Sequence, residues 1–122
     1  YAPGKWSLQQ LLGHIIDTER IFSYRALAIS RGERQALPSF DENEYLLHAQ
    51  YESQDFTDIL TQYRHVRQAT MSLIESFSTS QANQIGNANG QSVSVRALAW
   101  MIAGHEKHHI QVIKERYLIQ NP

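Results

Sequence analysis

The chain carries the run Gly104-His105-Glu106-Lys107-His108-His109 near its C-terminal end and a second Gly-His step, Gly13-His14, near its N-terminal end. Residues four apart on an α-helix lie on one face, so a helix through the first run places His105 and His109 side by side. A third imidazole, from His14 on another helix, completes a set of three nitrogen ligands. Such a set leaves a coordination position open, as catalytic metal sites do. The two stretches therefore predict a metal-binding helical bundle, and we expect an enzyme.

The composition is that of one folded domain, which we expect to span residues 1–122. Of its 122 residues 42% are hydrophobic and 19% are charged, and the net charge of −1 argues against nucleic acid as a partner. No apolar run approaches the ~20 residues of a membrane span, and the first residues lack a signal-peptide pattern. The chain has no cysteine, so we expect a cytoplasmic protein without disulfides, and any thiol chemistry needs a small-molecule thiol.

Helical spacing of apolar residues predicts three long helices, over about residues 7–31, 53–78 and 94–119. No segment predicts a strand, and residues 80–92 are expected to form a polar loop. The connection over residues 32–52 is predicted to contain a short helix that begins near Asp41. Because this connection is long enough to cross a bundle, the first two long helices can run parallel and the third antiparallel to both.

Two other metal motifs overlap the histidine run. His105-Glu106-Lys107-His108-His109 matches the H-E-x-x-H of zinc proteases. The extended form of that motif needs glycine and histidine where Val112 and Glu115 stand, and no strand is predicted to align a peptide. Glu106-Lys107-His108-His109 also resembles the Glu-x-x-His of di-iron bundles, which needs two such motifs where we find one. Both interpretations are therefore less favoured than a three-histidine site.

Several residues around the histidines have predicted roles. Glu106 and Asp17 are candidate proton shuttles, and Asp17 could instead orient the imidazole of His14 or form ion pairs on the helix surface. The glycine before each of His14 and His105 is expected to permit close approach of helices. The other histidines are expected to be exposed, and the two tryptophans to be core residues: they are His48, His65, His108, Trp6 and Trp100.

Longer stretches of the chain resemble a known family. Lys5-Trp6-Ser7, residues 12–20 and residues 99–109 are similar to the signature of the DinB-like superfamily. Leu37-Pro38-Ser39-Phe40-Asp41-Glu42-Asn43 resembles the branch related to bacillithiol S-transferases and metal-dependent hydrolases.

The resemblance implies an all-α, DinB-like four-helix bundle in up-down-down-up order. It implies a divalent metal, zinc or nickel above all, held by His14, His105 and His109, and a homodimer. The family usually has a helix ahead of Lys5-Trp6-Ser7, and this sequence lacks it. Three helices would leave an apolar stripe exposed, so we expect a truncated sequence, an unordered segment or a partner chain that covers the stripe.

Three functions follow as hypotheses. The first is metal-dependent transfer of a low-molecular-weight, bacillithiol-like thiol to an electrophilic small-molecule substrate, because a divalent cation lowers the pKa of a thiol that it binds. The second is hydrolysis by metal-bound hydroxide at the same ligands. The third is a non-catalytic, stress-associated metal-binding bundle. If the histidines are only structural, the purified protein carries no stoichiometric metal.

Overall fold

The computed structural model describes residues 6–118 and consists mainly of three long helices. They are α1 (Leu8–Ser30), α3 (Phe56–Glu75) and α5 (Val95–Ile113), and a π-helical turn, η2 (Lys114–Leu118), continues α5. The three predicted helices are confirmed, with ends shifted by a few residues. Residue 119, the predicted end of the third, lies outside the described residues.

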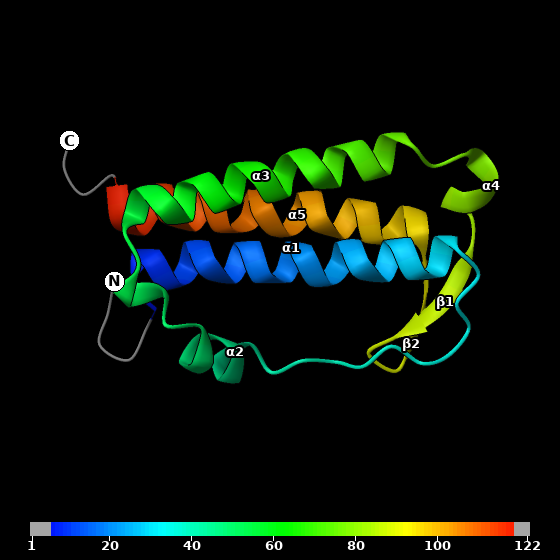
Figure 1. Ribbon diagram of the computed structural model, residues 1–122, viewed down its shortest axis with the longest axis horizontal. Helices are drawn as coiled ribbons and strands as arrows, with labels where there is room; N and C mark the ends of the chain where they lie inside the picture. The colour runs from blue at the N-terminus through cyan, green and yellow to red at the C-terminus, as the bar shows by residue number, and fades with distance from the viewer. Residues whose placement is uncertain (1–5, 119–122) are drawn as a thin grey trace.

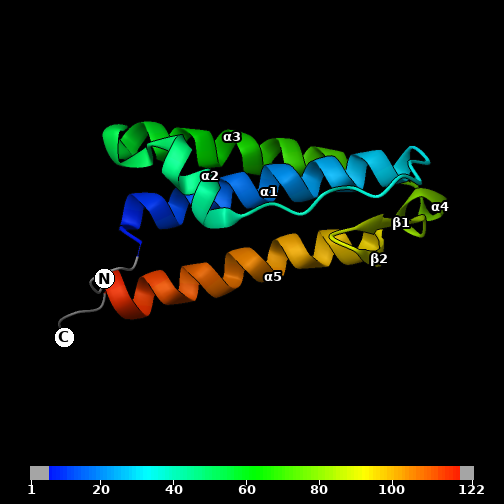
Figure 2. The same cartoon turned by 90° about the horizontal axis from the view of Figure 1, so that it is seen from below.

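The directions of the three long helices are those predicted from the length of the connection over residues 32–52. Figure 1 shows α1 and α3 running in the same direction and α5 running back beside them. Helix α1 packs along both of the others, and the turned view in Figure 2 shows it next to each. This arrangement brings the first half of α1 level with the second half of α5.

Side-chain caps determine where the first two helices begin. Ser7 accepts a hydrogen bond from the backbone N–H of Gln10, whose side chain accepts one from the Ser7 backbone N–H. In the long connection, Asp41 caps α2 (Glu42–Ala49) by accepting from two backbone amides. The short helix predicted near Asp41 is thereby confirmed, and a 3₁₀ turn, η1 (Tyr51–Ser53), follows it.

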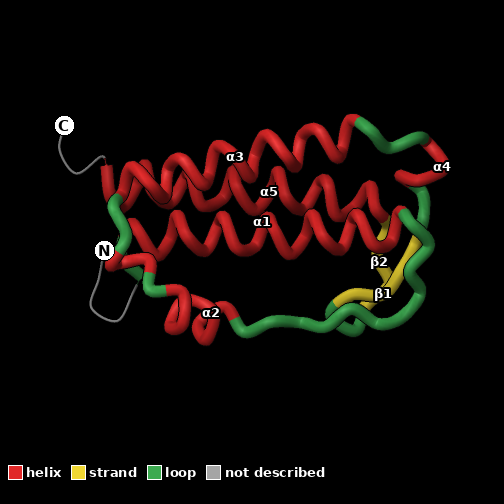
Figure 3. The backbone as a smooth tube through the Cα atoms, viewed as in Figure 1, coloured by secondary structure: helices red, strands yellow, loops and turns green. Residues whose placement is uncertain are grey.

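The predicted polar loop over residues 80–92 is wrong. This stretch holds most of a short helix, α4 (Thr79–Ala82), and a hairpin of β1 (Ile85–Ala88) and β2 (Gln91–Ser94), drawn in yellow in Figure 3. Asn89 and Gly90 form its two-residue turn with φ angles of 55° and 72°. Asn-Gly is the strongest short-range hairpin signal, because a type I′ turn needs positive φ at both positions.

The hairpin closes one end of the bundle. Leu37, in the long connection, donates its backbone N–H to Asn87 and accepts from Asn89, so the connection runs beside β1. Gly86 lies against Ile29 of α1, where a Cβ atom would overlap the isoleucine side chain. These contacts belong to an apolar cluster formed by α1, α5, the hairpin and the long connection. Its buried members are Ala26, Ile29, Leu37, Ala88, Val95 and Leu98.

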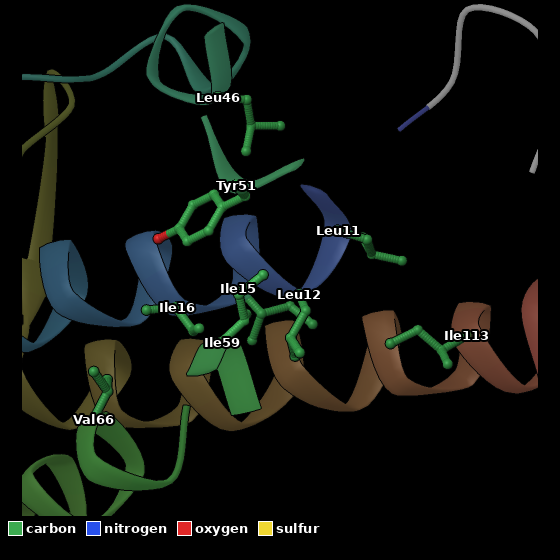
Figure 4. Packing of buried hydrophobic residues seen from close by; sticks show 9 residues of the cluster. All are labelled: Leu11, Leu12, Ile15, Ile16, Leu46, Tyr51, Ile59, Val66 and Ile113. Carbon is green, nitrogen blue, oxygen red and sulfur yellow. The ribbon is translucent and has the colours of Figure 1, made fainter. Parts of the chain in front are cut away.

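A second apolar cluster lies toward the other end of the bundle. Leu46 and Tyr51, both from the long connection, pack onto α1 there (Figure 4). The long helices supply its other buried members, which are Leu11, Leu12, Ile15, Ile16, Ile59, Val66 and Ile113. Burial of this cluster fixes α2 and η1 against the first half of α1.

The predicted apolar stripe is visible on the surface of α3 and α5. Trp100 is 73% exposed, so its prediction as a core residue is wrong, and Met71 and Met101 are each 45% exposed. Met71 and Trp100 line a groove of about 430 Å³ with Phe77 and Val95. Trp100 stays outside the core because no element of the described chain packs over this groove. Within residues 6–118, no helix is both long and apolar enough to span a membrane.

Candidate metal centre

Three imidazoles from two helices converge in the bundle. The Nε2 atom of His105 lies 3.0 Å from that of His14 and 3.1 Å from that of His109. The ligand atoms of all three lie within 4.8 Å of one another, an arrangement that could hold a metal ion. His105 and His109 are one turn apart on α5, and His14 comes from the antiparallel helix α1. We call these three residues the histidine triad.

Burial keeps the triad neutral. His14 is only 4% exposed, and His105 and His109 are half-buried. Burial, and to a smaller extent the neighbouring imidazoles, lower the pKa of each imidazole to about 4. At neutral pH, therefore, each ring has one nitrogen lone pair available to a metal ion.

The donor set fits a divalent transition metal. If the three Nε2 atoms carried protons, three N–H groups would point at one another. If the protons were on the Nδ1 atoms instead, three nitrogen lone pairs would point at one another. A cation at the shared point removes this conflict. A tetrahedral ion with nitrogens at 2.0–2.1 Å would keep them about 3.3 Å apart, close to the two short separations observed. The Nδ1 atom of His109 is buried without a hydrogen-bond partner among the described residues.

Thr18, rather than Asp17, is next to the outer nitrogen of His14. Its Oγ1 atom lies 3.4 Å from His14 Nδ1. The carboxylate of Asp17 instead accepts a 2.7 Å hydrogen bond from the hydroxyl of Tyr51. The prediction that Asp17 orients the imidazole is therefore wrong, because its side chain leaves α1 toward η1. Burial raises the pKa of Asp17, partly offset by the hydrogen bond from Tyr51 and the charge of Arg20.

A charged network next to the triad joins all three long helices. One guanidinium nitrogen of Arg67, on α3, lies 2.7 Å from Glu19 of α1 and 2.7 Å from Glu106 of α5. Glu19 is 4% exposed. Burial raises the pKa of Glu106, and the nearby charge of Glu19 raises it further. Sequence reasoning missed Arg67, since nothing in the local pattern of α3 distinguishes it from a surface arginine.

Two residues from outside the long helices border His14. The ring of Trp6 lies 4.7 Å from the imidazole ring, measured between centroids. The Oε2 atom of Glu42, at the start of α2, lies 3.7 Å from His14 Nε2. Trp6 is partly buried and packs against the second apolar cluster, as predicted, but Glu42 was not predicted to lie at the site.

The glycines before the histidines differ in role. A Cβ atom on Gly13 would overlap the ring of Tyr51, so this glycine permits the close approach of η1. Nothing lies within 4 Å of the same position on Gly104. The predicted close approach to another element is thus confirmed at Gly13, where the element is η1 and not a long helix. The same prediction is wrong at Gly104. The predicted exposure of the other histidines is confirmed for His48, His65 and His108.

Comparison with known proteins places this geometry in context. The chain is similar to the solved structure of YfiT from Bacillus subtilis, described as a probable metal-dependent hydrolase with an unusual four-helix bundle topology. The two share 14% sequence identity with a TM-score of 0.73, over 94% of this chain and 69% of YfiT, which establishes a shared fold. A search of curated proteins found no match. The family model of the DinB superfamily matches residues 1–113, and this chain therefore belongs to that superfamily.

Proposed function

We propose that this protein is a metal-dependent enzyme whose divalent cation is held by His14, His105 and His109. The observation that carries the proposal is the convergence of three neutral Nε2 atoms from two antiparallel helices. A divalent cation bound there would lower the pKa of a thiol or a water molecule and present the resulting anion to an electrophile. Zinc and nickel are our first candidates, because both accept imidazole ligands.

We further propose a low-molecular-weight thiol as the nucleophile and a small electrophile as its acceptor. Three imidazoles add no charge of their own, so a divalent cation among them attracts an anionic ligand such as a thiolate. The chain has no cysteine that could compete for the cation. The thiol would therefore arrive as a cosubstrate.

The chain's own residues have distinct tasks in this proposal. Arg67 holds the carboxylate of Glu106 against α3, one residue from His105. Because burial and Glu19 raise the pKa of Glu106, we propose it as the proton shuttle. Asp17 is less suited to this role, since its carboxylate lies toward η1, where it accepts a hydrogen bond from Tyr51. We assign Asp17 the task of holding Tyr51 over Gly13.

Hydrolysis is the second candidate, and the likeness to YfiT favours it. It would use the same three ligands with water as the nucleophile. A non-catalytic metal-binding bundle is the third, and it predicts bound metal without turnover. The homodimer and the cytoplasmic location also stay predictions; sedimentation and cell fractionation would test them.

Metal content tests the site directly. We would measure divalent metal in the wild-type protein, His105→Ala and His108→Ala by elemental analysis, after purification without chelator. We expect about one ion per chain in the wild type and in His108→Ala, whose imidazole is exposed outside the triad, and loss in His105→Ala. No metal in the wild type, and no uptake on titration, would overturn the proposal.

An activity comparison then separates the two chemistries. Metal-loaded protein is incubated with an aromatic halide electrophile, with and without a low-molecular-weight thiol, and in parallel with an ester and an amide substrate. Thiol-dependent product formation that His105→Ala loses supports transfer. Ester or amide cleavage without thiol supports hydrolysis, and neither reaction with metal bound supports the non-catalytic alternative.

A further inference from the structure

We propose that Glu42 is a fourth protein ligand of the cation at the histidine triad, which makes the site a three-histidine, one-carboxylate centre. The inference rests on the proposed metal site and adds to it a residue from the long connection. Glu42 Oε2 lies 3.7 Å from His14 Nε2. This separation is too long for a hydrogen bond and slightly longer than the roughly 3.3 Å between two ligands of one tetrahedral ion.

The packing of α2 directs Glu42 toward the bundle. Residues 42, 46 and 49 lie on one face of this helix, since they are spaced by four and three. Leu46 is buried in the second apolar cluster, and Ala49 packs against the same cluster. Figure 4 shows Leu46 on the side of α2 that faces α1. One turn earlier on this face, the Glu42 side chain meets His14.

A second set of contacts holds the start of α2 at this place. The indole N–H of Trp6 donates a 3.3 Å hydrogen bond to the side-chain oxygen of Asn43. The ring of Trp6 in turn packs beside the His14 ring, with 4.7 Å between centroids. The cap provided by Asp41 fixes the direction of the first turn. Glu42 is therefore brought to the triad by contacts on both sides of it.

The chemistry of the donor set agrees with this position. Carboxylate oxygens bind zinc at about 2.0–2.2 Å, nearly the distance of imidazole nitrogens. A carboxylate also offsets part of the charge that three neutral imidazoles leave uncompensated. The Glu42 side chain is 51% exposed, so it has room to change rotamer and bring its oxygen to the ion. The same exposure makes it the ligand that an incoming anionic nucleophile would displace most readily.

The test compares two glutamates in the first turn of α2. Metal-free wild type, Glu42→Gln and Glu44→Gln are titrated with zinc in competition with a chromophoric chelator, and with cobalt(II) while visible absorption is recorded. Glu44 shares the first helical turn, so its variant controls for the loss of a charge near the helix N-terminus. We expect Glu42→Gln to bind zinc at least about tenfold more weakly and to change the cobalt bands, and Glu44→Gln to match the wild type.

The outcomes separate this inference from the function on which it rests. Zinc affinity and cobalt spectra that are equal in Glu42→Gln and Glu44→Gln would overturn the role of Glu42 while leaving the histidine site in place. Absence of metal uptake by the wild type would overturn both. Circular dichroism of the metal-free variants checks that α2 and the bundle still fold.

Discussion

Removal of the guanidinium of Arg67 should destabilise the metal-free protein strongly. In Arg67→Met the apolar stem remains, but Glu19 and Glu106 lose the cation that lies 2.7 Å from each. Breaking a buried ion pair from one side costs about 3–5 kcal/mol, because the remaining charge stays buried and uncompensated. Glu19 is 4% exposed, whereas the side chains of Arg67 and Glu106 are 24% and 23% exposed. We therefore expect the lower end of that range, about 3 kcal/mol.

The measurement is urea unfolding followed by circular dichroism, with a chelator present so that bound metal does not contribute. A loss of about 3 kcal/mol corresponds to roughly 12 °C in the melting temperature of a domain of this size. Arg64→Met, at an exposed position of the same helix, is the matched control and should change the free energy of unfolding by less than about 0.5 kcal/mol. Glu19→Gln and Glu106→Gln, added to Arg67→Met, should restore much of the loss.

The pH dependence gives the reasoning a second test. Without Arg67, the carboxyl group of Glu106, whose pKa is already raised by burial and by the charge of Glu19, loses its neighbouring cation, so the folded variant binds a proton that the unfolded chain does not. Its free energy of unfolding then rises as pH falls toward 5, relative to the wild type. Two results would refute the assignment of Arg67 as the charge that compensates both glutamates. One is a loss in the free energy of unfolding of less than about 0.5 kcal/mol at pH 7, and the other is a loss that is the same at pH 5 as at pH 7.

Two further predictions concern the helix glycines and the histidine triad. Gly13→Ala should destabilise the protein by up to about 2 kcal/mol, because the overlap of the new methyl group with Tyr51 outweighs the gain in helix propensity. Gly104→Ala should stabilise the protein by about 0.5–1 kcal/mol, because the methyl group enters open space and only the gain in helix propensity remains. Thermal unfolding measures both, and equal shifts in the two variants would contradict the contact. In the metal-free protein, burial above all lowers the pKa of each triad imidazole from its ordinary 6.5 to about 4 in the folded state. The unfolded chain therefore binds more protons as pH falls from about 6.5 to 4, and stability should fall over that window, by at most about 3 kcal/mol for His14. Urea unfolding at several pH values checks this, and stability that does not change between pH 7 and 4.5 would speak against neutral buried imidazoles.

The amino-acid sequence was enough to predict the long helices and the convergence of the histidines. Apolar spacing defines the buried face of each helix, and the i, i+4 spacing of His105 and His109 requires them to share a side. The length of the connection over residues 32–52 allowed α1 and α3 to run parallel and α5 to run back beside them, which places His14 at the level of the α5 pair. The hairpin was also within reach of the sequence, since Asn89-Gly90 carries its turn signal.

The identity of the other side chains around the histidines depends on how the helices and the long connection pack together. Arg67 compensates Glu19 and Glu106 because three helices meet at one level, and no local pattern on α3 records that meeting. Glu42 reaches His14 through the fold of a connection whose path depends on the burial of Leu46. Helical periodicity specifies the face of each element, because it repeats within the element. The neighbours of a polar side chain depend on contacts between elements far apart in the chain, and these arise only when the cores of the bundle pack.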